Sequence, residues 1–267
     1  MDRKPAVAGQ FYPGSEKALK KELKKLFPEN AKPRKAMGAI APHAGYQYSG
    51  KVAADVFANI IVPKKCIILS PNHTGMGNNA SIMTDGNWEV PTGNIPVDNE
   101  MSFRLLESCN DLKVDFSAHM LEHSLEVLLP FMLERQPELS IVPICLSSLR
   151  QETMQKIGEA IADVIKNSGQ DILLVVSSDM NHYEDQGITL EKDRMAIDKV
   201  VALDATGLIN TCADHRISMC GVIPVATAIF AWKSLGAKTV TLVDHKTSGD
   251  TTGDYNAVVG YAGFIIE

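Results

Sequence analysis

Apolar residues gather in short segments along this chain, and three of these segments run directly into a histidine. The segments are Gly38–His43, Ile67–His73 and Leu173–His182. Each predicts a buried strand that is ended by a proline or a polar cluster, with the imidazole just past the strand. Ligands collect beyond the carboxyl ends of the strands in open α/β sheets. The pattern therefore predicts a metal site, or an acid/base site beside one, at a single edge of the sheet.

Strand and helix patterns alternate along the whole chain, which is typical of a largely parallel sheet with helices on both faces. The segment Ser81–Val97 predicts short antiparallel strands or a hairpin, and Pro130 predicts a bend or an end in its helix. Strands are predicted over Ala36–Ala41, Lys65–Ser70, Leu112–Phe116, Leu139–Leu146, Asp171–Ser177, Lys238–Val243 and Ala257–Ile266. Helices are predicted over Ser15–Phe27, Ser49–Ile60, Asp98–Ser108, Ser124–Glu134, Gln151–Lys166, Leu190–Leu203, Ala205–Cys212 and Cys220–Leu235.

Length and composition narrow the class of protein. A chain of 267 residues without a Pro/Gly/Ser-rich linker predicts one α/β domain over residues 1–267. The net charge of −6 argues against a nucleic-acid binder, which needs a basic surface. No apolar run approaches the roughly 20 residues that cross a bilayer, and the N-terminus lacks the apolar core of a signal peptide. Five cysteines without regular spacing favour a reducing cytoplasm. The missing apolar run predicts no membrane association.

His43 and His73 share one local arrangement. In both, a strand is followed by a proline, then the histidine, then a glycine two residues further on. A single histidine in such a place is typical of a structural hydrogen-bonding residue. The repetition favours a functional role, because imidazole is the commonest side-chain metal ligand and a strand end fixes its direction.

Three further candidates are acid/base groups. Asp179 and His182 follow the most apolar strand, where they can orient a ligand or take a proton. His123 precedes a predicted helix, and two interpretations stay open: a proton carrier or substrate clamp, or an incidental neighbour of a helix that Ser124 caps. The His119/His123 spacing lacks the glutamate of a metalloprotease helix, which argues against that class.

Cys220 differs from the other four cysteines because it precedes Gly221 and an apolar helix. A helix N-terminus favours a thiolate, so a reactive or metal-binding role competes evenly with simple burial. Cys66, Cys109, Cys145 and Cys212 lie in or beside apolar stretches and are expected to be inert. The polar loop Ser248–Asp254 is expected to shape the rim of the same site.

Taken together, these motifs resemble the MEMO family over essentially the whole chain. The matching segments are Gly9–Pro13, Pro42–Tyr46, Asn72–His73, Glu122–Glu126, Ser177–Tyr183, Met219–Gly221 and Gly260–Phe264. The resemblance implies a fold similar to the class III nonhaem-iron extradiol dioxygenases. It also implies a metal pocket with His43, His73 and Cys220 as ligands, Asp179 and His182 close by, and His123 in the lining.

The resemblance also implies partners and chemistry. Animal members are linked to receptor signalling, bind phosphotyrosine peptides and are connected to copper or iron redox chemistry. Prokaryotic members often accompany a radical-SAM protein. This chain has Val222-Ile223-Pro224 where the animal pattern has Arg-His-Pro, which weakens any transfer of the peptide-binding role. A thiolate in place of the dioxygenase carboxylate suits copper or zinc as well as Fe(II), and it is itself oxidisable.

Two main hypotheses follow. The first is a metal-dependent redox enzyme with an iron or copper site, in which His182, Asp179 and His123 handle protons. The second is a non-catalytic module that recognises an anionic (phospho)peptide or metabolite in the same pocket. Zinc-assisted hydrolysis is a third option that no spacing selects. The fold alone assigns no reaction and no substrate.

Overall fold

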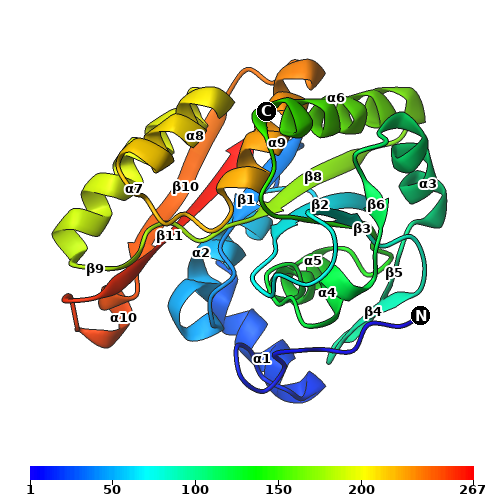
Figure 1. Cartoon of the computed structure of the whole chain (residues 1–267). Helices are drawn as coiled ribbons and strands as arrows, with labels where there is room; N and C mark the ends of the chain where they lie inside the picture. The colour runs from blue at the N-terminus through cyan, green and yellow to red at the C-terminus, as the bar shows by residue number, and fades with distance from the viewer.

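A nine-stranded mixed sheet forms the centre of the computed structural model, which describes residues 1–267 (Figure 1). Its central strands run parallel, whereas strands near both edges are antiparallel. In spatial order the strands are β10 (Val240–Thr247), β11 (Val258–Ile266), β1 (Gly38–Ala41), β8 (Ile172–Ser177), β2 (Lys65–Pro71), β7 (Ser140–Leu146), β3 (Ala80–Ile82) and β6 (Lys113–Val114), with β9 (His182–Glu184) paired to β11. The predicted α/β fold with a largely parallel sheet is confirmed.

Helices cover both faces of this sheet (Figure 1). One face carries α3 (Asn99–Ser108), α6 (Gln151–Ser168), α7 (Gln186–Val201), α8 (Ala205–Asp214) and α9 (Val222–Leu235). The other carries α1 (Glu16–Leu26), α2 (Tyr46–Ala58), α5 (Leu129–Arg135) and the hairpin of β4 (Asn87–Val90) and β5 (Gly93–Pro96). The short helices are α4 (Ser117–Met120), a 3-10 turn (Glu126–Leu128) and α10 (Gly249–Thr252). None of the helices has both the length and the apolar character needed to cross a membrane.

Strand β8 shows why the central strands have nearly continuous apolar sequences. Leu174 and Val176 enter the core under α6 and α9, whereas Leu173 and Val175 enter the core under α1 and α2. A strand that is covered on both faces needs apolar residues at consecutive positions rather than alternate ones. The predicted buried strands at β1, β2 and β8 are therefore confirmed, and they carry the segments that lead to His43, His73 and His182.

The predicted helix over Ser124–Glu134 was wrong in its first half. The chain forms the 3-10 turn, and α5 begins only at Leu129 with Pro130 in its first turn, where a missing N–H breaks no hydrogen bond. Ser124 is not a helix cap. Its hydroxyl donates instead to the Pro71 carbonyl at 3.2 Å, across to the end of β2. The residues around His123 therefore form a loop held against the sheet.

Arg3 fixes the N-terminal segment to this loop although it is almost completely buried. Its guanidinium pairs with the Glu126 carboxylate, donates to the Glu122 carbonyl at 2.6 Å and donates to the His119 carbonyl at 3.1 Å. The guanidinium carbon also lies 4.4 Å from the centre of the Trp88 ring. Every side of the charge has a partner, which is the condition under which a buried arginine is tolerated.

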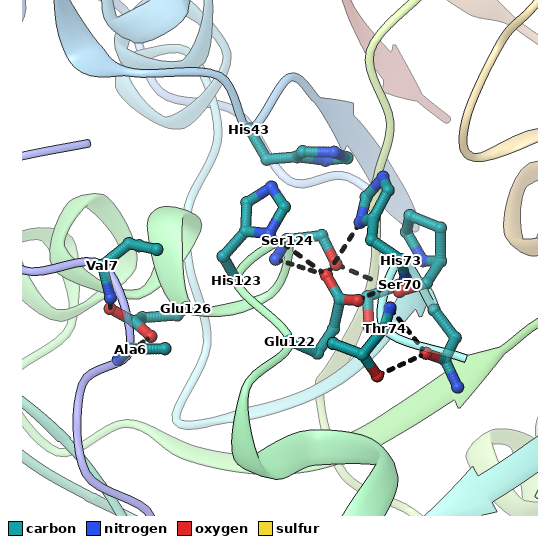
Figure 2. A network of polar contacts seen from close by, with 12 residues as sticks. Ala6, Val7, His43, Ser70, His73, Thr74, Glu122, His123, Ser124 and Glu126 are labelled. Atoms are coloured by element: carbon teal, nitrogen blue, oxygen red, sulfur yellow. Dashed lines mark hydrogen bonds and ion pairs between the residues drawn. The ribbon is translucent and has the colours of Figure 1, made fainter. Parts of the chain in front are cut away.

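Glu126 completes the attachment from the loop side. Its carboxylate accepts hydrogen bonds from the Ala6 and Val7 amides at 2.7 and 3.1 Å (Figure 2). It also accepts one from the Tyr12 hydroxyl. Glu126 lies three residues after His123, so the same carboxylate that holds the N-terminal segment also fixes the loop that presents His123.

We expect Arg3→Met to lower the free energy of unfolding by about 3–5 kcal/mol, because the Glu126 carboxylate would stay buried without its counter-ion. Urea denaturation followed by circular dichroism measures this. Lys4→Met is the matched control, since Lys4 pairs with Glu89 at the surface and its loss should change stability little. A loss no larger for Arg3→Met than for Lys4→Met would contradict the assigned role of the buried pair.

Candidate metal centre

The carboxyl ends of three neighbouring parallel strands deliver the candidate residues to one edge of the sheet. His43 follows β1, His73 follows β2 and Asp179 follows β8, which lies between them, and each is two residues past the end of its strand. The proline and glycine around His43 and His73 end the strands and turn the chain, as the sequence indicates. The predicted convergence at one edge is therefore present in the fold.

Three imidazoles form the centre of this site. One ring nitrogen each of His43, His73 and His123 lies within 4.8 Å of the others, which is a geometry that can hold a metal ion. The ring centroids are 4.9–5.6 Å apart, and Figure 2 shows the three rings around a common space. His123 comes from the loop after α4 rather than from a strand end, so it joins the site only through tertiary packing.

Hydrogen bonds at Nδ1 orient two of these rings. His73 Nδ1 lies 2.9 Å from the Glu122 carboxylate, which also accepts from the His73 amide. His43 Nδ1 lies 2.8 Å from the Ser177 hydroxyl, and this hydroxyl donates its own proton to the Ser124 carbonyl at 2.6 Å. Both rings therefore hold a proton on Nδ1, so that the neutral form of each ring presents the Nε2 lone pair that a metal needs.

Burial and neighbouring charges set the protonation of the cluster. Burial, with the neighbouring imidazoles, holds the pKa of His43 well below its usual range, and burial also lowers the pKa of His123. For His73, burial is outweighed by the hydrogen bond and charge of Glu122, so its pKa is raised. Burial opposes ionisation of Glu122, but donors from His73 and Ser124 bring its pKa to about 2. Neutral imidazoles beside a permanent carboxylate are the forms in which histidine binds metals.

Cys220 contacts this cluster through His43 only. Its sulfur lies 3.4 Å from His43 Nε2 and accepts from the Asp179 amide at 3.2 Å. It immediately precedes Gly221, the N-cap of α9, as predicted. Burial raises the pKa of the Cys220 thiol, with a further contribution from the Asp179 charge. The thiol is therefore adjacent to one histidine of the trio and is protonated unless a metal displaces the proton.

Asp179 and His182 border the cluster without joining it. The Asp179 carboxylate accepts from the His43 amide at 2.8 Å and so fixes the backbone from which that ring projects. Burial raises the Asp179 pKa. His182 opens β9, and its Nδ1 lies 2.9 Å from the Ser218 carbonyl, so Nδ1 donates there and Nε2 keeps its lone pair. Both residues line the same pocket as the three clustered imidazoles.

A pocket of about 820 Å³ opens outward from the imidazoles. Its inner end is formed by the histidines and Asp179, and its outer walls come from the N-terminal segment, the start of α2, β9, β11 and the loop between β10 and β11. Ser248, Thr252 and Asp254 of that loop line the pocket, so the prediction that the loop shapes the rim is confirmed.

The sequence alone predicts no role for Glu122 or Ser177, the two groups that orient His73 and His43. A polar residue that closes a completely buried strand was the available signal for Ser177. Glu122 was visible only as an acid next to His123, and its bond to His73 crosses a separation of 49 residues. His245 pairs with the buried Asp193 at 2.7 Å and does not line the pocket.

The chain is therefore an α/β protein with a candidate metal site in a histidine-lined pocket at the carboxyl edge of its sheet. Comparison with known proteins gives its family. A family model described as Memo-like protein matches residues 3–265. A MEMO1 family protein of Methanopyrus kandleri is 41% identical over 279 residues, with 99% of each chain covered. Another, from Methanosarcina barkeri, is 41% identical over 267 residues, covering 99% of this chain and all of the relative. The chain belongs to the MEMO family.

A likeness in fold alone extends further. An uncharacterized protein from Escherichia coli K12, solved by crystallography, superposes with a TM-score of 0.56 over 84% of this chain and 98% of its own length. The two sequences are only 12% identical. The arrangement of sheet and helices is therefore shared, whereas no site residue or activity is transferred by this match.

We expect Glu122→Gln to weaken Zn²⁺ or Co²⁺ binding by about 10- to 100-fold, because the amide cannot supply the charge that raises the basicity of His73. Competition against a chromophoric chelator measures the affinity. Glu138→Gln removes an exposed carboxylate that pairs with Lys64 and serves as the control. Equal affinities for the two variants would contradict the role assigned to Glu122.

Proposed function

We propose that this protein is a metal-dependent redox enzyme in which iron or copper binds at the carboxyl edge of the sheet. Zinc suits the same donors, but it would support hydrolytic rather than redox chemistry. The observation that carries the proposal is the convergence of His43, His73 and His123 on one space, with their ring nitrogens within 4.8 Å of one another. The proposed ligands are His43 and His73, with Cys220 as the third.

The donor chemistry fits such a metal. Imidazole suits iron, copper and zinc, and a thiolate makes the site softer and more favourable to copper and zinc. His43 and His73 have their Nδ1 atoms occupied by fixed acceptors, so they need no reorientation to present Nε2. A bound ion would supply redox or Lewis-acid chemistry next to the pocket. The protein's own groups supply the orientation, the burial and the proton transfers.

The remaining polar groups are proposed to handle protons. His182 keeps an unprotonated Nε2 at the pocket wall, and His123 is neutral at ordinary pH because burial lowers its pKa. Asp179 holds the His43 backbone and lines the pocket, where its carboxyl group can exchange a proton with substrate. These assignments place three general acid/base groups in the lining of the same pocket.

The composition of the pocket favours this proposal over the second hypothesis. Recognition of phosphoryl or other strongly anionic groups generally uses arginine or lysine. No arginine or lysine lines this pocket, and two aspartates do. A module for anionic peptides would therefore have only its imidazoles, or a metal bound to them, to pair with the negative charge.

Spectroscopy of the Co²⁺-loaded protein can show which residue is the third metal ligand. If Cys220 binds the metal, the Co²⁺ form of the wild type should show a sulfur-to-cobalt charge-transfer absorption, and Cys220→Ser should lose it while still binding cobalt through the histidines. Cys212→Ser changes a buried cysteine of α8 outside the pocket and should keep the band. A wild-type protein that binds cobalt without the band, but loses cobalt in His123→Ala, would replace Cys220 by His123 in the ligand set.

The metal itself is tested by elemental analysis of protein purified without oxygen or chelators. We expect close to one equivalent of iron or copper in the wild type and little in a His43→Ala/His73→Ala variant, which loses both proposed imidazole ligands. A His215→Ala variant, altered at an exposed histidine outside the pocket, is the control. Wild-type protein without stoichiometric metal, or unchanged metal in the double variant, would refute the proposed function.

A further inference from the structure

The outer half of the pocket has a chemistry of its own. Its walls carry the aromatic rings of Phe11, Tyr48, Tyr183 and Tyr261, and the loop between β10 and β11 adds Asp254. The proposed redox site uses none of these residues. Together with the missing arginine and lysine, they make an electron-rich wall that faces the opening.

Tyr183 is the most unusual of these aromatic residues. The residue is 76% exposed, and its backbone has φ +58°, a left-handed conformation that costs free energy for any residue with a Cβ. Both neighbours are fixed: the His182 amide donates to the Ser218 hydroxyl at 2.8 Å, and Glu184 binds Lys192. Backbone strain of this kind clusters at ligand sites, where the surrounding structure maintains it. The left-handed backbone of Tyr183 therefore coincides with the pocket wall.

Tyr48 and Tyr261 extend the same wall inward. Tyr261 lies on β11 with its side chain almost completely buried, and Tyr48 lies in the first turn of α2. Both line the same pocket as Tyr183. Tyrosines from three different elements, α2, β9 and β11, therefore contribute to one pocket wall.

Asp254 supplies a carboxylate that the protein does not neutralise. Its Oδ1 accepts from the Asn256 amide and side chain at 3.0 and 2.8 Å, which orients the group. Its Oδ2 has no hydrogen-bond partner, and no lysine, arginine or histidine pairs with it. Aromatic faces combined with an unpaired carboxylate are the arrangement that attracts an ammonium group.

We propose that the outer half of the pocket binds the ammonium group of an amine-bearing ligand, against Tyr48, Tyr183 and Tyr261 with Asp254 as the counter-charge. This ligand class rests on the proposed function, because the other end of the same ligand would then lie beside the metal. A cationic ligand gains cation–π and ionic attraction here, whereas a phosphoryl group meets carboxylate and ring faces that repel it.

The test uses two probes of equal shape and different charge, choline and its neutral carbon isostere 3,3-dimethyl-1-butanol. A quaternary ammonium group cannot coordinate a metal, and the hydroxyl group that could is the same in both probes, so the difference between their affinities reports the wall alone. NMR titration of the Zn²⁺-loaded protein should give at least about tenfold tighter binding of choline than of the isostere. Inorganic phosphate, titrated in parallel, should not compete with choline. Equal affinity of the two probes would overturn the proposal.

Substitutions in the pocket wall test whether its residues cause the preference for choline over the neutral isostere. Asp254→Asn and Tyr183→Gly should each reduce the choline preference to about threefold or less. Arg216→Gly is the matched control for Tyr183→Gly: it also relieves a left-handed residue, with φ +51°, but at a position that does not line the pocket. Both glycine variants should melt no lower than the wild type, so folding does not explain a lost preference. A preference unchanged in Asp254→Asn and Tyr183→Gly would refute the assigned wall.

The same titration without metal separates this inference from the proposed function. If the protein binds no metal but still prefers choline, the proposed redox function is refuted and the proposed amine-bearing ligand is supported. If metal binds stoichiometrically and choline binds no better than its isostere, the proposed amine-bearing ligand is refuted and the proposed metal site is supported.

Discussion

Two buried carboxylates, Glu122 and Glu126, hold the loop that completes this site. Both are excluded from water, where an unpaired charge would cost roughly several kcal/mol. The loop is therefore stable only where these carboxylate oxygens have hydrogen-bond donors. Glu122 finds them at His73 and Ser124, at the end of β2, and Glu126 finds them at Arg3 and the N-terminal segment. Between these two anchors lies His123. The position of His123 is therefore determined by where the Glu122 and Glu126 carboxylates find hydrogen-bond donors and a counter-ion.

The same carboxylates connect stability to chemistry. Glu122 pairs with His73 and so favours its protonated form in the absence of a metal, while His43 and His123 are kept neutral by burial. A divalent ion placed among the rings would replace the proton as the partner of the Glu122 charge. Burying the Glu122 carboxylate costs free energy, but its charge raises the basicity of His73 toward a metal. Carboxylate–histidine–metal arrangements work in this way.

The sheet and its strand-end histidines could be predicted because they depend on local sequence. Apolar runs at β1, β2 and β8, covered on both faces, leave a clear pattern, and the proline and glycine around His43 and His73 mark the strand ends. The loop around His123 could not be predicted in the same way. Its partners are 49 residues away for Glu122 and 123 residues away for Glu126, and no local pattern encodes such pairings. The apolar spacing over Ser124–Glu134 instead predicted one continuous helix.

The number of donors around His43 limits what the centre can be. His73, His123 and Cys220 all approach it, but four protein ligands would close a tetrahedral site, as in structural zinc centres. Catalytic centres keep three protein ligands and leave a position for substrate or water. A redox function therefore requires that either His123 or Cys220 stays off the metal. The excluded group then lies beside the reacting atoms, as a neutral imidazole that can take a proton or as a thiol that can give one. The choice of third ligand thus also decides which group performs the acid/base chemistry.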